Sequence, residues 1–174
     1  MAGSFPKLLI LMRHAQKTGL PGDTGLSAFG DERARALAEA WPRAMPPLDL
    51  IIACRSTAKS SRPVDTVRPL ADALNVPIDD RWGTQDYQAL ARQVISDPDN
   101  RDRRILICWR HDTLPQLAAS VGAAAPSWPD DLYDQLWLLE QVQEAVLLRI
   151  EHQPPRAESQ GSGVSRDRAE KEPR

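Results

Sequence analysis

The sequence predicts an α/β domain, a three-layer α/β/α sandwich in which helices cover both faces of a mostly parallel central sheet. Three observations lead to this prediction. Short apolar runs alternate along the chain with segments of helical periodicity, which is the pattern of parallel β-α-β units. The 174 residues are 41% hydrophobic, enough for one core and too few for two comfortable domains. Three of the apolar runs are followed directly by basic side chains, so charge is expected at one edge of the sheet.

The first half of the chain predicts two strand-helix pairs. The strand, helix, strand and helix cover, in order, residues 7–12, 26–44, 48–54 and 62–75. Ser27 is the expected N-cap of the first helix, because its hydroxyl can accept a hydrogen bond from a free N–H of the first turn. Pro46 and Pro47 end that helix. Pro63 lies in the first turn of the second helix, where its missing N–H costs little.

The second half predicts one more strand between two helices and then a terminal hairpin. The helix, strand and helix cover residues 87–96, 103–109 and 114–122. Residues 133–151, "YDQLWLLEQVQEAVLLRIE", predict a β-hairpin with residues 140–144 as its turn. A single long helix competes with the hairpin here, because Glu, Gln and Leu favour helices.

Composition divides the chain into a domain and a tail. Residues 1–152 contain all the periodic apolar segments and are predicted to form one domain. Residues 153–174 are rich in Pro, Ser, Gly, Glu and Arg and contain almost nothing apolar. Such a segment cannot bury enough surface to offset the entropy of ordering, so we expect a disordered C-terminal tail.

Charge and cysteine usage narrow the class of partner and the compartment. The chain has 22 Lys and Arg against 24 Asp and Glu, a formal net charge of -2, so no global attraction to nucleic acid or to an anionic membrane is expected. The apolar run near the amino terminus is too short for a secretory signal or a membrane span. Cys54 and Cys108 are far apart in the sequence and are expected to be reduced, which favours a cytoplasmic protein. The oligomeric state stays open.

Each basic cluster follows a predicted strand. Arg13 and His14 follow the first strand, residues 55–62 ("RSTAKSSR") follow the second, and Arg110 and His111 follow the third. The carboxyl ends of parallel strands meet at one edge of a sheet, where loops converge and helix amino termini point their free N–H groups at the crevice. Two histidines and at least two arginines at such an edge predict a phosphoryl-binding site.

The arrangement resembles the histidine phosphatase superfamily, the phosphoglycerate mutase-like proteins. The resemblance covers residues 7–122 and depends on four stretches that stand in the family's order: "LMRHAQK", "GLSAFGDERARALA", "SSRPVDT" and "LICWRHDTLPQLAASVG". They correspond to the strand-borne Arg-His motif, the Leu-Ser and Gly pattern, the second arginine four residues before a threonine, and the second histidine. The family's usual Arg-His-Gly is Arg-His-Ala here. No long insertion lies between residues 75 and 103, so the resemblance is to a small member without a large cap insertion.

The resemblance implies a fold, a mechanism and a set of residues. It implies the phosphoglycerate mutase-like sandwich and a phosphatase in which His14 becomes a covalent phosphohistidine that water hydrolyses. Arg13 and Arg62 would hold the oxygens of the transferring group, and His111 would donate a hydrogen bond to them. Arg62 is preferred as the second cation because of its spacing to Thr66; the alternatives are Arg55, Lys59 and Arg110. No metal and no cofactor is expected, since the arginines supply the positive charge.

The acid that would protonate a leaving alcohol is less defined. Asp112 directly follows the second histidine, as the acid does in one branch of the family, and is the weakly preferred candidate. In the other branch the acid lies earlier, where this sequence has Asp79, Asp80 and Asp86. The small phosphohistidine phosphatases of the family use no such acid, because a protonated imidazole leaves easily, so the absence of an acid is a further alternative.

Other functions stay open beside the phosphatase. The same fold can serve as a non-catalytic module that holds a phosphorylated partner, and a phosphoglycerate mutase-type phosphotransferase is the less favoured enzyme. A zinc site formed by Cys54, Cys108, His14 and His111 has the right residue types but lacks a close Cys-x-x-Cys pair. The expected partner is a small phosphorylated substrate or a phosphoprotein, and the sequence does not name it.

Overall fold

The protein is built on one six-stranded sheet with the strand order β3-β2-β4-β1-β5-β6. This computed structural model describes residues 4–155. Four strands are parallel and two, at one side of the sheet, form an antiparallel hairpin. The strands are β1 (Leu8–Arg13), β2 (Leu50–Ala53), β3 (Ile78–Asp79), β4 (Arg104–Trp109), β5 (Gln135–Val142) and β6 (Ala145–His152).

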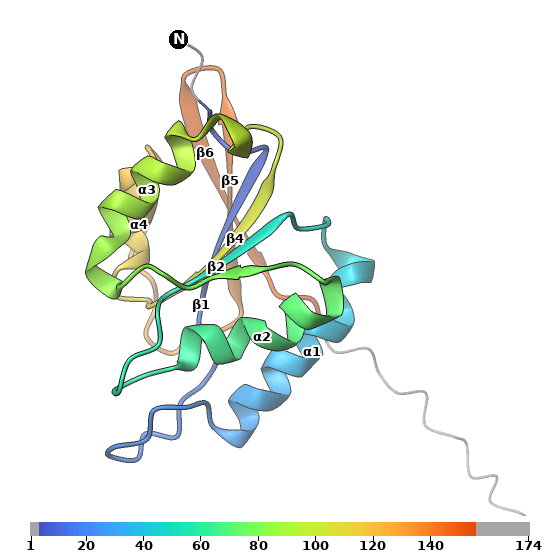
Figure 1. Cartoon of the computed structure of the whole chain (residues 1–174), viewed down its shortest axis with the longest axis vertical. Coiled ribbons are helices and arrows are strands. Elements are labelled where there is room, and N and C mark those ends of the chain that lie inside the picture. Colours follow the sequence, from blue (N-terminus) through green and yellow to red (C-terminus); the bar gives the residue numbers. More distant parts are fainter. Residues whose placement is uncertain (1–3, 156–174) are drawn as a thin grey trace, which may run out of the picture.

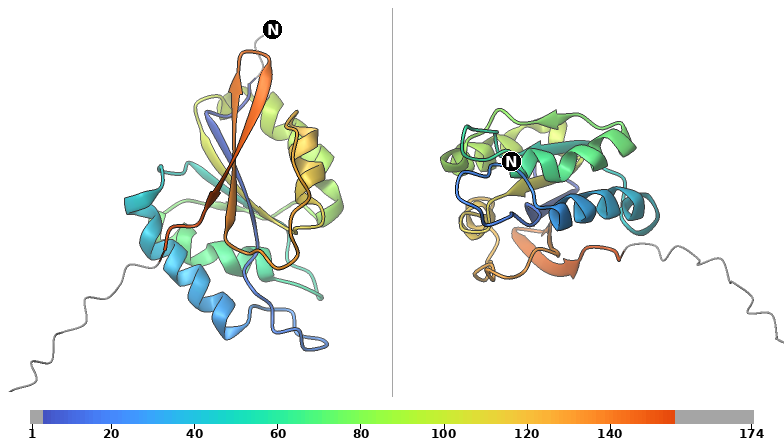
Figure 2. Two further views of the ribbon diagram at one scale, coloured as in Figure 1. Left: turned by 180° about the vertical axis from the view of Figure 1, so that it is seen from behind. Right: turned by 90° about the horizontal axis from the view of Figure 1, so that it is seen from below.

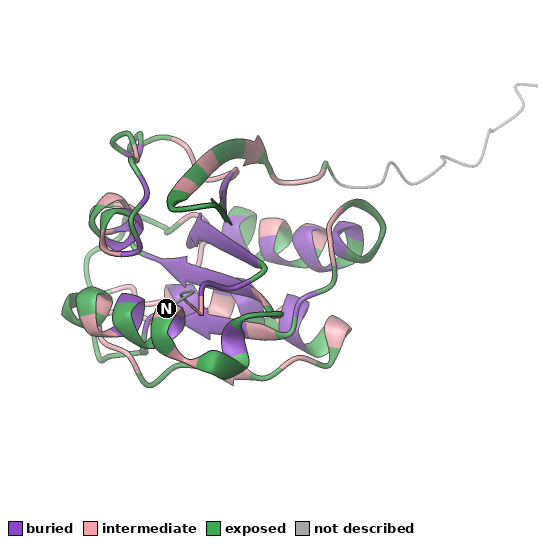
Figure 3. Ribbon diagram, turned by 90° about the horizontal axis from the view of Figure 1, so that it is seen from above, coloured by how far each residue is buried: buried purple, intermediate pink, exposed green. Residues whose placement is uncertain are grey.

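Four α-helices cover the two faces of the sheet, which confirms the three-layer sandwich (Figure 1). One core cluster joins the sheet to α1 (Ala28–Ala44) and α2 (Arg62–Leu74), and the other joins it to α3 (Tyr87–Ser96) and α4 (Leu114–Ser120). Two short 3-10 helices, η1 (Thr84–Asp86) and η2 (Pro98–Asn100), flank α3. Figure 3 shows buried strands between helices whose outer faces are exposed.

The unbroken apolar runs of the central strands follow from this burial on both faces. All six residues of β1 are buried, and the side chains alternate between the two cores because successive strand residues point to opposite faces. Leu9 and Leu11 pack against α3 and α4, whereas Ile10 and Met12 pack against α1 and α2. Within residues 4–155, no helix is long and apolar enough to cross a membrane.

Two residues of the stretch "GLSAFGDERARALA" determine where α1 begins. Ser27 is the N-cap, as predicted, and its hydroxyl oxygen accepts a hydrogen bond from the Gly30 N–H at 3.1 Å. Gly30 is also required by space, because a Cβ at this position would lie 2.3 Å from the Gln16 carbonyl oxygen. The helix can therefore approach the loop that follows β1 closely only with glycine here.

The terminal segment is a hairpin, and the competing long helix is wrong. β5 and β6 pair from Gln135 and His152 up to Val142 and Ala145, and Figure 2 shows the hairpin extending beyond the helices. The turn is the two residues between the strands, shorter than the predicted 140–144, because the ladder continues through Glu140 and Gln141. Gln143 adopts a φ of 57°, the left-handed conformation that a tight two-residue hairpin turn needs.

The predicted tail lies mostly outside the described residues. Its first residue, Gln153, is held by two hydrogen bonds, from its backbone N–H to the Asp134 carbonyl at 2.6 Å and from its amide to the Tyr133 carbonyl at 3.1 Å. Gln153 is thus bonded to the segment that precedes β5. Residues 156–174 lie outside the part of the chain that the structure describes.

Candidate functional site

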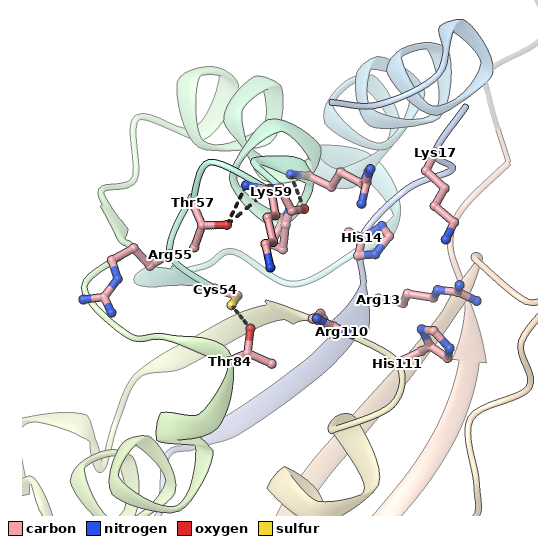
Figure 4. Close-up of a pocket in the computed structure, with 13 residues that line it drawn as sticks. Arg13, His14, Lys17, Cys54, Arg55, Thr57, Lys59, Thr84, Arg110 and His111 are labelled. Carbon is pink, nitrogen blue, oxygen red and sulfur yellow. Dashed lines mark hydrogen bonds between the residues drawn. The ribbon is translucent and has the colours of Figure 1, made fainter. Parts of the chain in front are cut away.

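The carboxyl ends of β1, β2 and β4 meet at one edge of the sheet and surround a pocket of about 250 Å³. Its lining comes from the loops that follow these three strands, from the start of α2 and from η1 (Figure 4). Arg13, His14, Arg62 and His111 all line this one cavity. The four residues that the motifs singled out are therefore brought together.

His14 is buried at the wall of the pocket and is held by hydrogen bonds to the backbone. It is 7% exposed, its backbone N–H donates to the Trp109 carbonyl at 3.2 Å, and its Nδ1 lies 2.7 Å from the Ala15 carbonyl oxygen. Because a carbonyl only accepts, Nδ1 is the protonated nitrogen and Nε2 keeps its lone pair. Burial lowers the pKa of His14 from 6.5 to about 4, the charges of Arg13, Arg62 and His111 act in the same direction, and the bond to Ala15 opposes them.

Thr66 ties the loop after β1 to α2. Its side chain is almost fully buried, and its hydroxyl oxygen accepts a hydrogen bond from the Ala15 N–H at 2.8 Å. The hydroxyl itself donates to the Arg62 carbonyl at 2.7 Å, one helical turn earlier. The spacing of four residues between arginine and threonine thus has a structural reason, because one threonine positions both the loop after His14 and the first turn that bears Arg62.

Arg13 reaches from the end of β1 to the loop before β5. Its Nη1 donates to the carbonyls of Asp130 at 2.6 Å and Leu132 at 3.2 Å, and its Nη2 donates to the Tyr133 hydroxyl at 3.1 Å. The guanidinium carbon also lies 3.8 Å from the centre of the Tyr133 ring, a cation–π contact. The buried Nε–H has no partner among the described residues. An oxygen acceptor in the pocket is the group that this donor lacks.

The loop that holds Arg13 was not predicted from the sequence. Trp128 anchors it, because the indole stacks on Trp137 with centroids 4.6 Å apart and donates to the Leu132 carbonyl at 3.0 Å. Two of the three hydrogen bonds that Arg13 donates are accepted by backbone carbonyls, for which any side chain would serve. Only Tyr133, an aromatic hydroxyl immediately before an apolar strand, could have signalled a polar role.

Arg62 lies in the first turn of α2 and is held by the loop between β1 and α1. Its Nε donates to the Gly25 carbonyl at 2.9 Å, and its Nη2 donates to the Asp23 carbonyl. A guanidinium has five N–H donors, so these two bonds leave others free for a ligand. The contacts fix the plane of the guanidinium at the rim of the pocket, which a flexible lysine could not achieve.

His111 lies in the turn after β4 and is less constrained than His14. Its side chain is 27% exposed, and its Nε2 is 3.1 Å from a carboxylate oxygen of Asp130, a residue whose own side chain is 93% exposed. Its Nδ1 is buried without a hydrogen-bond partner in residues 4–155. Burial lowers the pKa of His111, Arg13 also lowers it, and the carboxylates of Asp112 and Asp130 raise it.

No carboxylate is found among the described residues that line the pocket. Asp112, the weakly preferred acid, is exposed and forms a two-bond ion pair with Arg110 at 3.2 and 2.7 Å. Asp79 pairs with Arg81, and Asp86 accepts a hydrogen bond from the Gly83 N–H at 2.7 Å. Asp80 is exposed. The structure thus brings none of the four candidate acids into the lining.

The pocket holds more cations than the motifs require. Six Arg and Lys side chains line it: Arg13, Lys17, Arg55, Lys59, Arg62 and Arg110. The sequence presented three of them as substitutes for Arg62, but they accompany it. Lys17 and Thr84 line the pocket although the sequence analysis gave them no role, and Cys54 lines it although it was considered only as a zinc ligand. Lys17 could have been found from its place in "RHAQK", three residues after His14.

The four residues proposed for a zinc site do not converge. Cys54 belongs to the core on the α3 and α4 side of the sheet and Cys108 to the core on the α1 and α2 side. Burial raises the pKa of both thiols, which disfavours the thiolate that binds metals. Among residues 4–155, no group of three or more His, Cys, Asp or Glu side chains is placed to hold a metal ion.

Comparison with known proteins supports the fold. No protein-family model and no curated protein matches the chain. Solved structures do match: the protein histidine phosphatase SixA complexed with tungstate has a TM-score of 0.55 and 14% identity, over 83% of this chain and 96% of that chain. The alpha-ribazole phosphatase from Shigella flexneri has a TM-score of 0.53 and 17% identity, over 83% and 96%.

A third match extends the comparison to mutases. The phosphoglycerate mutase from Plasmodium falciparum has a TM-score of 0.54 and 14% identity, over 83% of this chain and 89% of that chain. At sequence identities this low, the matches show only that the fold is shared. The chain therefore has the phosphoglycerate mutase-like fold, as its sequence predicted.

Proposed function

We propose that this protein is a phosphatase that hydrolyses a phosphomonoester or a phosphorylated protein side chain through a covalent phosphohistidine on His14. The observation that carries the proposal is the tautomer and neutral charge of the His14 ring. Its Nδ1 proton is fixed by the Ala15 carbonyl, and its pKa of about 4 keeps the ring neutral at neutral pH. A buried neutral imidazole with a free Nε2, on the wall of a cationic pocket, is a nucleophile suited to phosphorus.

The reaction proceeds in two displacements. In the first, the Nε2 lone pair of His14 forms a bond to phosphorus while the bond from phosphorus to the leaving group breaks, and the leaving group keeps the electron pair. In the second, water attacks the phosphohistidine, the P–N bond breaks and its electron pair returns to Nε2. The water proton passes to solvent or product, and inorganic phosphate and neutral His14 are regenerated.

The other motif residues hold the oxygens of the transferring group. Three of the five N–H donors of Arg13 are used by the protein, so two remain, the buried Nε–H among them. Arg62 supplies a second guanidinium. A bound phosphoryl dianion raises the pKa of His111, and its orphaned Nδ1 can then donate to an oxygen. No metal is assigned a role, because guanidinium groups supply the positive charge.

The lining favours leaving groups that need no carboxylic acid. Asp112 is held in an ion pair with Arg110 and does not line the pocket. We therefore favour a phosphorylated histidine side chain, which departs as a neutral imidazole once protonated, or an ester of an acidic alcohol. We place the activity in the cytoplasm, where unpaired thiols such as Cys54 and Cys108 are stable.

Rapid quenching with phosphorus-labelled substrate tests the proposal. The wild type should release phosphate from an aryl phosphate and should carry acid-labile label on the protein, in the presence of EDTA as well. His14→Ala should lose the label and more than about a thousandfold in turnover, because no other group is placed to attack in line. Label that persists in His14→Ala, or phosphate binding without any label in the wild type, would contradict the covalent mechanism. The second result would favour the non-catalytic binding module.

A further inference from the structure

The distribution of charge around the pocket exceeds what one phosphoryl group requires. The chain as a whole carries a formal net charge of -2, yet among residues 4–155 six Arg and Lys side chains and no carboxylate line this cavity of about 250 Å³. A phosphoryl dianion is balanced by two guanidinium groups. Cations gathered around a small cavity repel one another, so a surplus is maintained at a cost in stability unless a ligand neutralises it.

The surplus cations are not equivalent. Arg110 is neutralised by Asp112, and Arg55 donates one hydrogen bond, at 3.2 Å, to the Arg81 carbonyl. The ammonium of Lys59 has no hydrogen-bond or ion-pair partner within residues 4–155. The ammonium of Lys17 has none either, so Lys59 and Lys17 are the lining cations for which the described residues provide no acceptor.

Lys59 also lies on a different side of His14 from Arg13 and His111. Figure 4 shows Lys17 with Arg13 and His111 on one side of His14, and Lys59 on the side of Cys54 and Thr84. The chain around Lys59 is built as a tight turn, because Thr57 and Ser60 exchange backbone hydrogen bonds at 2.9 and 3.2 Å and the Thr57 hydroxyl oxygen accepts from the Lys59 N–H. This turn fixes the backbone from which Lys59 reaches into the pocket.

We propose that the Lys59 side of the pocket is a second anion subsite, and that the substrate carries a second acidic group besides the transferred phosphoryl group. Lys59 provides the charge, Arg55 adds to it, and the Thr84 hydroxyl, which lies 3.3 Å from the Cys54 sulfur, provides a hydrogen-bond donor. The inference deepens the proposed function, and it depends on the phosphoryl group binding beside His14.

The size of the cavity restricts the second acidic group to a position near the phosphoryl group. About 250 Å³ is below the usual range of pockets for drug-sized ligands, so only a few bonds can separate the two anions. The shared chemistry is a second carboxylate or phosphate close to phosphorus. It can come from a small metabolite with two acidic groups or from an acidic side chain next to the phosphorylated one.

Calorimetric binding of non-hydrolysable probes tests the subsite without requiring turnover. The probes are bisphosphonates with methylene, ethylene or trimethylene spacers, each measured against the alkylphosphonate of the same chain length. At least one bisphosphonate should bind about tenfold more tightly than its partner, well above the twofold that two equivalent heads give by statistics. No gain with any spacer would overturn the inference.

Two variants that each remove one positive charge distinguish a specific effect of Lys59 from an effect of the overall charge of the protein. Lys59→Gln should reduce the bisphosphonate preference about fivefold or more. Lys7→Gln removes the same charge from an exposed position before the amino end of β1 and should keep the preference. If both variants lower the preference equally, only the overall charge matters and the subsite is refuted.

The same measurements distinguish this inference from the proposed function and identify the source of the anion. If no phosphonate binds at all, both proposals fail; if the predicted preference is found but no substrate is hydrolysed, only the phosphatase fails. A pair of peptides carrying a phosphonate analogue of phosphoserine, followed by Asp or Asn, provides the second arm. Preference for the Asp peptide assigns the second anion to a protein substrate, whereas preference with bisphosphonates alone assigns it to a small molecule.

Discussion

The two histidines of the pocket follow two neighbouring parallel strands but have different surroundings. His14 continues β1, is nearly fully buried and is fixed by bonds to the backbone of Trp109 and Ala15. His111 lies in a turn after β4, and its side chain is 27% exposed. Within residues 4–155 its ring contacts one polar partner, the Asp130 carboxylate, which is itself 93% exposed. One ring is therefore held by the core of the sheet and the other by the surface.

This difference suggests two roles: His14 keeps a fixed orientation, and His111 can adjust its position. In the proposed mechanism the nucleophile must keep one tautomer and one direction through both displacements, and the bonds of His14 would provide this before any ligand arrives. A residue that only stabilises charge can adjust, since it must follow the oxygens as they move. Removing His111 should therefore cost rate and leave the covalent step possible.

The largest effect that separates the two histidines is expected in kinetics. His111→Ala should lower kcat on the order of a hundredfold, because one hydrogen bond to the transferring oxygens is removed, and should still form the acid-labile label that His14→Ala lacks. Single-turnover quenching of both variants measures this directly. Loss of label in both would show that the histidines act as one unit and that the proposed division is wrong.

The next effect concerns stability against pH. His14 has a pKa of about 4 in the folded protein and an ordinary value of 6.5, so between these values the unfolded chain binds a proton that the folded chain does not. The free energy of unfolding therefore falls as pH falls from about 6.5 to about 4, and this penalty is absent above 6.5.

The expected size of the penalty follows from the span of the shift. At pH 4 the wild type should have lost on the order of 3 kcal/mol relative to pH 7 beyond any loss shown by His14→Asn, because each pKa unit is worth about 1.4 kcal/mol. Urea unfolding of both proteins at the two pH values gives the difference, in which the other titrating groups cancel. His111→Asn should show a smaller difference of the same sign, since that ring is less buried. Equal differences would remove the contrast between the two sites.

Sequence patterns predicted the strands of the sheet well where burial on both faces made them unmistakable. β1 and β4 are apolar except for one terminal arginine each, so their existence and their place in a mostly parallel sheet followed from composition and alternation with helices. β3 was not predicted, because its two residues are too short to show any period and depend on pairing with β2. The hairpin was predicted but its turn was placed too widely, since Glu140 and Gln141 look like turn residues although they continue an exposed ladder.

Prediction of the site succeeded for residues fixed by motif spacing and failed for contacts made by backbone. Arg13, His14, Arg62 and His111 share one pocket, as the three strand ends implied. The carbonyls of the loop before β5 that hold Arg13 leave no side-chain signal. The general acid was the weakest prediction, because the position of Asp112 next to His111 in the sequence does not determine where its side chain points. In the structure Asp112 forms an ion pair with Arg110.

The smallest expected effect concerns the hydrogen bond by which Thr66 holds the loop after His14. Two threonines occupy comparable places: Thr66 donates to the Arg62 carbonyl and Thr113 to the Arg110 carbonyl, at 2.7 and 3.3 Å. Only Thr66 also accepts from a buried backbone N–H, that of Ala15. Thr66→Val keeps the shape and leaves that N–H unpaired, which should cost about 1–3 kcal/mol of unfolding free energy.

The matched variant Thr113→Val should cost less than about 0.5 kcal/mol, because its hydroxyl is partly exposed and water can replace it. Thr66→Val should in addition lower kcat, since the loop that orients His14 is loosened, whereas Thr113→Val should leave labelling of His14 at the wild-type rate. Urea unfolding and single-turnover labelling of the two variants provide both measurements. Equal losses of stability would mean that the bond between Thr66 and Ala15 does not anchor the nucleophile, and its rigidity would then have to come from the strand alone.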